Sequence, residues 1–129
     1  MEYVALTGIS ERVVSELRQN RLLTIEIRSP YNFMAALHLN VGDMLFLTHT
    51  SPEDLTGGSM GLVVKLLRHQ VSTHRVTQSN EIYYEERETT SLRLQLDLKC
   101  VARVRKVLNS ALGETTKVDA EEMPVYNAR

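Results

Sequence analysis

The stretch LRLQLDLKC, residues 92–100, decides the fold of this chain. Leucines occupy every second position until Cys100, and polar or charged residues lie between them. A period of two is typical of a β-strand with one buried and one exposed face. It is the clearest strand signal in the chain, so we expect a sheet whose core contains these leucines and whose other face carries Arg93, Gln95, Asp97 and Lys99.

Other segments supply partners for this strand. Further strands are expected at residues 3–6, 22–28, 44–50 and 60–76, with a hairpin arm at 82–90. A helix is expected after Ser10, whose hydroxyl fits an N-cap, with Ile9 packing against Val14 and Asn20 as its stop. A second, short helix is expected within residues 31–39, followed by a turn at 40–43.

The pattern changes after Cys100. Apolar residues then recur at positions 101, 104, 107, 108, 111 and 112, and Gly113 lies where a helix C-cap is common. This spacing predicts a C-terminal helix over residues 101–112, although VARVRKVL also fits a continuing strand. We therefore expect one domain at 1–113, followed by a C-terminal tail at 114–129 with too few apolar residues to predict order.

Composition limits the class of protein. With 129 residues, of which 43% are hydrophobic, the chain suits a single domain, and Cys100 alone cannot form an internal disulfide. The formal net charge of −1 requires any nucleic acid to bind a local basic patch. There is no cationic leader and no apolar run of about 18 residues, so we expect a cytoplasmic protein with no membrane partner.

The expected elements amount to about six strands with one early helix, an α+β arrangement with a mixed sheet curled toward a barrel. Within it, TIEIR (24–28), VGDMLFL (41–47) and GSMGLVVKLL (58–67) resemble the ASCH branch of the PUA-like β-barrels. The resemblance covers about residues 9–76 and implies a small PUA-like (ASCH-like) mixed β-barrel. The whole chain is also similar to a small archaeal family of uncharacterised proteins.

The resemblance extends to single positions. The residues that match the ASCH pattern are Thr24, Glu26, Arg28, Gly42 and Asp43. Residues 21–23 do not match, and Leu23 stands where hydrolytic members carry a lysine that serves as the catalytic base. An aliphatic side chain cannot take up a proton, so the resemblance implies a non-catalytic pocket floored by Thr24, Glu26 and Arg28. The competing interpretation is a structural ion pair between Glu26 and Arg28.

Charges are unevenly distributed along the chain. Residues 55–80 contain no acid but carry Lys65, Arg68 and Arg75, whereas acids gather at residues 81–88 and 114–122. This segregation predicts a basic face on a nearly neutral protein, with the three cations as a phosphate track. Its alternative is a solvated surface on which basic and acidic strands pair.

Three functions remain. An RNA-binding module leads, with Thr24, Glu26, Arg28, Lys65, Arg68 and Arg75 as the binding residues. The alternatives are a small ASCH-type amidohydrolase or nucleoside-binding pocket, and a protein-interaction or homo-oligomeric domain that pairs strand edges near Tyr83 and Leu92. We expect no metal and no cofactor, because His69 and His74 are five residues apart and face opposite sides of a strand.

Overall fold

The computed structural model describes residues 1–109 and 115–123. In these residues it contains a sheet of six strands, two α-helices and one 3-10 turn, η1 (Pro52–Asp54). The helices are α1 (Glu11–Asn20) and α2 (Pro30–Leu37). The strands are β1 (Glu2–Leu6), β2 (Leu22–Ile27), β3 (Met44–Leu47), β4 (Met60–Asn80), β5 (Tyr83–Asn109) and β6 (Lys117–Glu122). No helix in the described residues has the length and apolarity needed to cross a membrane.

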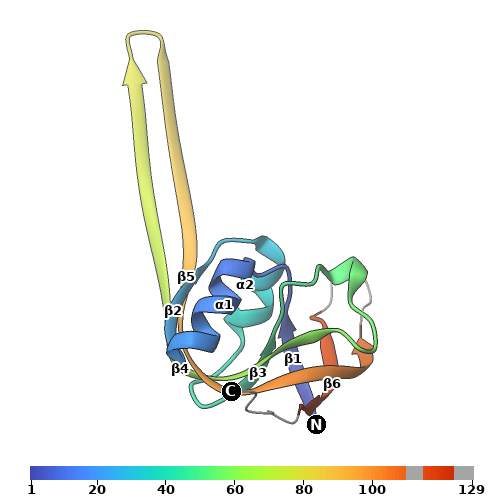
Figure 1. Cartoon of the computed structure of the whole chain (residues 1–129). Coiled ribbons are helices and arrows are strands. Elements are labelled where there is room, and N and C mark those ends of the chain that lie inside the picture. The colour runs from blue at the N-terminus through green and yellow to red at the C-terminus, as the bar shows by residue number, and fades with distance from the viewer. Residues whose placement is uncertain (110–114, 124–129) are drawn as a thin grey trace.

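The strands form one mixed sheet in the order β2-β5-β4-β3-β1-β6, and β6 pairs with β5 as well. The pairings of β1, β3, β4, β5 and β6 therefore make a closed circuit, with β2 added outside it on β5 (Figure 1). Only β1 and β3 are parallel among these pairs. The expected mixed α+β class is confirmed.

The alternating leucines of β5 form the centre of the core, as predicted. Leu92, Leu94 and Leu96 are fully buried, and they lie opposite Ile27, Ile25 and Leu23 of β2. The helices close this side of the sheet with small or aliphatic side chains, including Leu17 of α1 and Ala36 of α2. The stripe predicted from LRLQLDLKC thus fixes which side of β2 faces inward.

The predicted cap of the first helix is confirmed. Ser10 Oγ accepts a hydrogen bond from the Arg12 N–H at 3.2 Å, which satisfies one of the free amides of the first turn. The helix ends at Asn20, and Arg21 follows in the left-handed region with φ of 66°. Its N–H bonds to the Leu17 carbonyl, so β2 starts directly after the helix.

The predicted C-terminal helix at 101–112 is wrong over its described part, because β5 continues as a strand to Asn109. Ala102 and Val104 point into the core with the strand's period of two. A register shift between Val104 and Lys106 then inserts an extra residue opposite β6. The bulge shifts the alternation of inward and outward side chains by one residue. The apolar positions on either side of it are therefore three residues apart, a spacing that resembles a helix. Residues 110–112 lie outside the described part.

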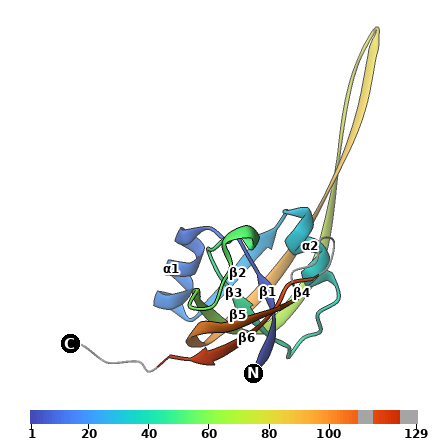
Figure 2. The same cartoon turned by 90° about the vertical axis from the view of Figure 1, so that its right-hand side faces the viewer.

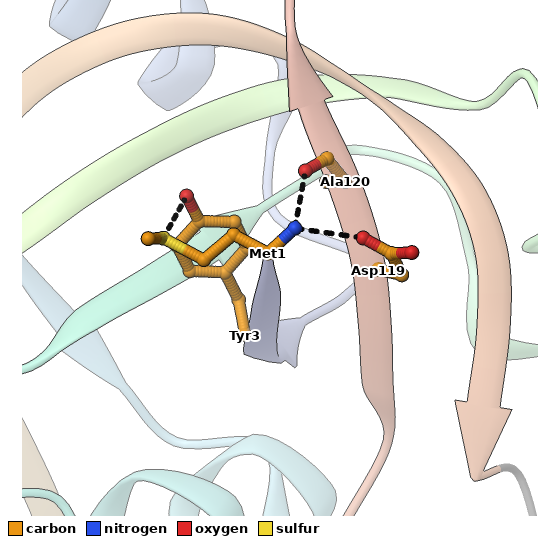
Figure 3. Close-up of polar contacts among 4 residues, drawn as sticks. All are labelled: Met1, Tyr3, Asp119 and Ala120. Carbon is orange, nitrogen blue, oxygen red and sulfur yellow. Dashed lines mark hydrogen bonds and ion pairs between the residues drawn. The ribbon is translucent and has the colours of Figure 1, made fainter.

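Strand β6 lies within residues 114–129, the range expected to be a tail. It pairs with β1 and β5 and buries Val118 and Ala120. Figure 3 shows the start of β1 against it, where the amino group of Met1 donates to Asp119 Oδ1 at 2.8 Å and to the Ala120 carbonyl at 3.4 Å. The same ammonium group lowers the pKa of Asp119. Part of the expected tail therefore belongs to the sheet.

Strands β4 and β5 continue beyond the body as a two-stranded arm, residues 73–90 (Figures 1 and 2). The expected hairpin is present, but it is longer than predicted, with pairing from Thr73 opposite Thr90 to Asn80 opposite Tyr83. Glu81 and Ile82 form the turn. Every residue of the arm is exposed except Glu85, which is half-buried.

We expect Leu96→Asp to unfold the domain, since Leu96 is fully buried opposite Leu23 and Leu66. A carboxylate there has no cation to pair with, and an uncompensated buried charge costs about 3–5 kcal/mol. The control is Gln95→Asp, one residue away on the outer face. Thermal melts followed by circular dichroism measure both, and a cooperative melt of Leu96→Asp near the wild-type temperature would contradict the core assignment.

Candidate functional site: a basic face beside a strand-edge pocket

Three strands build the outer face of the sheet opposite the helices. Directly paired residues place their side chains on the same face. The outward rungs across β2, β5 and β4 are Leu22–Asp97–Lys65, Thr24–Gln95–Arg68 and Glu26–Arg93–Gln70. The intervening rungs, such as Ile25–Leu94, belong to the core, so these three rungs face solvent.

We define the basic face by its charged residues, five cations against two carboxylates. Its members are Arg28, Lys65, Arg68, Arg93 and Lys99 with Glu26 and Asp97. Arg28 follows the last residue of β2 and joins the face through Glu26, while Lys99 joins it through Asp97. A surplus of positive charge is thus gathered on one face of a chain whose formal net charge is −1.

Glu26 orients two guanidinium groups at one end of this face. Arg28 Nε donates to Glu26 Oε1 at 2.6 Å, and Arg93 Nε lies 3.5 Å from Glu26 Oε2. The hydrogen bond from Arg28 is the main reason why the pKa of Glu26 is lowered, and the charges of Arg28 and Arg93 add to it. The remaining nitrogens of Arg28 stay available because its side chain is 74% exposed.

At the other end of the basic face, near Asp97, fewer of the positive charges are paired with carboxylates. Lys99 Nζ lies 2.9 Å from Asp97 Oδ2 and lowers the pKa of Asp97, with smaller contributions from Arg21 and Lys65. Among the described residues, no carboxylate oxygen comes within 4.0 Å of the charged nitrogens of Lys65 or Arg68. Their charges are therefore open to an external anion.

A pocket of about 350 Å³ borders the basic face along β2. One wall contains every residue from 23 to 29, and the other contains residues 8–10, Val13, Glu16 and Asn32. A pocket on one face of a strand meets only alternate residues, so this pocket runs along the edge of β2. Thr24, Glu26 and Arg28 are thus brought together in its wall.

The edge of β2 presents backbone groups to this pocket. The Leu98 N–H donates to the Arg21 carbonyl at 2.7 Å, which fixes the alternation of the antiparallel ladder. In the register of β2 and β5, Ile25 and Ile27 then bond to β5, whereas Thr24 and Glu26 turn their N–H and C=O groups outward. Within the described chain β2 pairs with β5 alone, so these groups line a free edge.

The lining of the pocket is largely aliphatic and polar, with few ionisable side chains. Leu23 is half-buried and packs against the core, so it leaves an aliphatic wall at its position. The ionisable residues of the lining are Glu16, Glu26 and Arg28, and Glu16 is paired with Arg12 at 3.3 Å. A carboxylate with a lowered pKa is a weak base near neutral pH, which makes Glu26 a poor general base.

Arg75 lies apart from the other predicted site residues. It is on the arm, seven positions after Arg68, and the ladder between the two arginines has no register shift. The two arginines therefore point to opposite faces of β4. Arg75 Nε lies 2.9 Å from Glu86 Oε1, and a second nitrogen lies 3.8 Å from Glu88.

Arg93 and Lys99 were not among the predicted binding residues, although both belong to the basic face. The alternation of LRLQLDLKC already places them on one side of β5 with Asp97. What the sequence lacks is the register that puts Arg93 opposite Glu26. Pairing between strands that are some 70 residues apart in the chain is a property of the folded sheet.

We expect Arg28→Ala to raise the pKa of Glu26 toward the ordinary value of a glutamate, because its principal donor is removed. In the wild-type protein the lowered pKa means that the ion pair stabilises the fold at pH values above the pKa that Glu26 has in the unfolded chain. That contribution is lost as the pH falls through the folded pKa. Carboxyl ¹³C titration by NMR measures the shift, and Arg93→Ala is the control with the smaller expected change.

An unaltered Glu26 titration in Arg28→Ala would contradict this arrangement of charges.

Comparison with known proteins confirms the expected similarity to an uncharacterised archaeal protein. A family model described as "Protein of unknown function (DUF473)" matches residues 1–118. The chain is also 28% identical over 105 residues to "Uncharacterized protein MJ0105" of Methanocaldococcus jannaschii. That match covers 78% of this chain and 66% of the relative, so it spans somewhat less than two thirds of the relative's length. No solved structure gives a significant match.

Proposed function

The chain belongs to the DUF473 family, and we propose that it is a non-catalytic RNA-binding domain of PUA-like type. The observation that carries the proposal is the position of the edge pocket, which opens directly beside the basic face and shares Glu26 and Arg28 with it. A face that attracts phosphates beside a pocket that holds a base is the combination needed for single-stranded RNA.

The basic face supplies the attraction in this proposal. Lys65 and Arg68 contact phosphates, because no described carboxylate neutralises them. Each phosphate that a cation neutralises releases counterions, so the affinity falls as salt rises. Arg75 contributes only where an RNA also reaches the arm, since it must first leave Glu86 and Glu88.

The pocket supplies discrimination. Glu26 holds the Arg28 guanidinium in a fixed orientation at the mouth, and a planar group held in this way can donate to a base edge or a phosphate. The outward backbone groups of Thr24 and Glu26 offer alternating donors and acceptors to the edge of an unstacked base. The aliphatic wall at Leu23 gives the base an apolar surface.

The PUA-like assignment rests on the strand circuit together with the sequence resemblance. We interpret the closed pairing of β1, β3, β4, β5 and β6 as a small barrel, with β2 and α1 forming the pocket beside it. Gly42 and Asp43, which match the ASCH pattern, form the turn before β3, where Gly42 has φ of 99°. This turn brings the Gly42 N–H to the Leu66 carbonyl of β4 at 2.7 Å.

We expect Arg68→Glu to weaken binding to single-stranded RNA, because it reverses a charge that faces solvent on the basic face. The double variant Lys65→Glu/Arg68→Glu should lower the log–log salt slope by about two units, one for each phosphate contact. Gel-shift titrations at two salt concentrations measure this. Arg75→Glu is the matched control, with the same charge change on the same strand, and we expect it to have the smaller effect.

Arg28→Ala should reduce discrimination among RNA sequences more than bulk affinity, since an oriented group reads the ligand while Lys65 and Arg68 only attract it. Thermal melts of every variant separate lost binding from lost folding. The proposal is wrong if the wild-type protein shows no salt-dependent RNA binding, or if Arg68→Glu and Arg75→Glu are equivalent.

The hydrolase alternative makes a different prediction. Without a base at Leu23, we expect no amidase activity on acylated cytidines, while Leu23→Lys places an amine in the pocket wall beside Thr24 and can introduce trace turnover. Product release is followed by liquid chromatography. Turnover by the wild-type protein that disappears in Glu26→Gln would show that another base serves and would favour the hydrolase.

A further inference from the structure

The arm is the largest feature that the proposed function leaves unused. It is a two-stranded ribbon with both faces exposed, and two-stranded hairpins without a covering layer are marginally stable in water. Local contacts support it, among them Arg75 with Glu86 and Tyr83 with Glu85. They leave both long edges of the ribbon without a neighbour among the described strands.

The register shows which backbone groups point away from the ribbon. A two-residue turn at 81–82 makes Asn80 and Tyr83 a hydrogen-bonded pair, and such pairs then alternate down the ladder. The pairing at the base of the arm gives the same alternation. The backbone groups of Arg93 do not bond to β2, so they bond to Gln70 of β4. The outward-facing residues are Thr73, Arg75, Thr77 and Ser79 on β4, and Tyr84, Glu86, Glu88 and Thr90 on β5.

The two edges differ in how well they tolerate another copy of themselves. On β5 the outward residues include Glu86 and Glu88, so two such edges would bring like charges together. On β4 there is no acid, no proline and no register shift from Arg68 to Asn80. Charges, prolines and bulges are the devices that protect an edge strand from pairing, and β4 has only Arg75.

We propose that two copies of this chain associate through the β4 edges of their arms, forming a four-stranded ribbon with β5 on the outside. The two-fold axis passes through Val76, so that Thr73 pairs with Ser79 of the second copy and Arg75 pairs with Thr77 of the second copy. This register uses the whole exposed edge of β4 and makes about eight new backbone hydrogen bonds. It also prevents Arg75 of one copy from lying directly opposite Arg75 of the other.

The two-fold register also places an apolar side chain at its centre. Val76 is 52% exposed in a single chain. In the paired ribbon it lies directly opposite Val76 of the second copy, in a non-hydrogen-bonded pair whose Cα atoms are about 4.5 Å apart. Facing β-branched side chains stabilise such a pair. The contact is self-complementary, as a two-fold dimer requires.

A second copy fits the arm better than nucleic acid does. The arm carries four glutamates against two arginines, and each arginine is paired with a glutamate of β5. A ribbon with this charge repels phosphates. The expected homo-oligomer is thereby assigned to β4, whereas the sequence suggested the strands around Tyr83 and Leu92.

Two proline variants on one rung test the proposal. Thr77 and Glu86 face each other across the arm, and the N–H of each points outward, so a proline at either position keeps the ladder of the arm. Thr77→Pro blocks the β4 edge and Glu86→Pro blocks the β5 edge. We expect the wild-type protein and Glu86→Pro to have twice the 14.7 kDa mass of one chain, and Thr77→Pro to have the single mass.

Light scattering after gel filtration, without RNA, measures these masses from about 1 to 100 μM, because the dimer population depends on chain concentration. Far-ultraviolet circular dichroism checks that both variants are folded. A monomeric wild-type protein, or a Thr77→Pro variant that is still dimeric, would overturn the proposal. A dimer lost in Glu86→Pro alone would assign the contact to β5 instead.

Disulfide capture tests the register independently of proline. In a Cys100→Ser background, Val76→Cys places two thiols across the two-fold axis, at a Cα separation within the range of about 4.4–6.8 Å for a disulfide. We expect mild oxidation to give a covalent dimer on non-reducing gels. Gln78→Cys, on the same face but two residues from the axis, is the matched control and should stay monomeric. Equal crosslinking of both variants would refute the register.

Discussion

The structure depends on the burial of one face of β5. This strand is 27 residues long and pairs with β4 over most of its length, with β2 near its middle and with β6 at its end. Because Leu92, Leu94 and Leu96 lie inward, the β2 residues that pair with them also lie on the core side of the sheet. A shift of one residue would expose the core side chains, so the register is strongly specified.

The candidate site is a consequence of that register. Once the leucines are inward, Arg93 and Asp97 must be outward, where they meet Glu26 of β2 and Lys65 of β4. The same pairing leaves β2 at the edge of the sheet, so its backbone groups border the pocket next to the charges. The ion pairs here are exposed, and exposed pairs contribute little to stability, so their placement is better explained by orientation than by folding.

Much of this arrangement is local and could be predicted from the sequence. The cap at Ser10, the inward leucines and the shared face of Thr24, Glu26 and Arg28 follow from patterns of a few residues. After Cys100 the sequence favoured a helix and left a continuing strand as the alternative, because the bulge at Val104 breaks the alternation that identifies a strand. Strand β6 was missed because six residues with two buried side chains become a strand only between β1 and β5. The separation of Arg75 from Arg68 also requires the register, since both are basic residues of one strand.

Strands β4 and β5 carry mainly positive charge near the body of the domain and mainly negative charge along the arm. The two regions therefore suit different partners. Near the body, β4 and β5 contribute Lys65, Arg68 and Arg93, whereas the arm contributes most of the acids through β5. This distribution of charge favours a phosphate chain at the body over one at the arm, so the RNA and the second copy that we propose use separate surfaces. Pairing through β4 leaves both basic faces free, because its rungs begin beyond the base of the arm. The continuous β4–β5 ladder then connects the two proposed surfaces, and a dimer would present two basic faces to one RNA. Linked sites of this kind bind more tightly than either site alone only when their spacing matches the ligand.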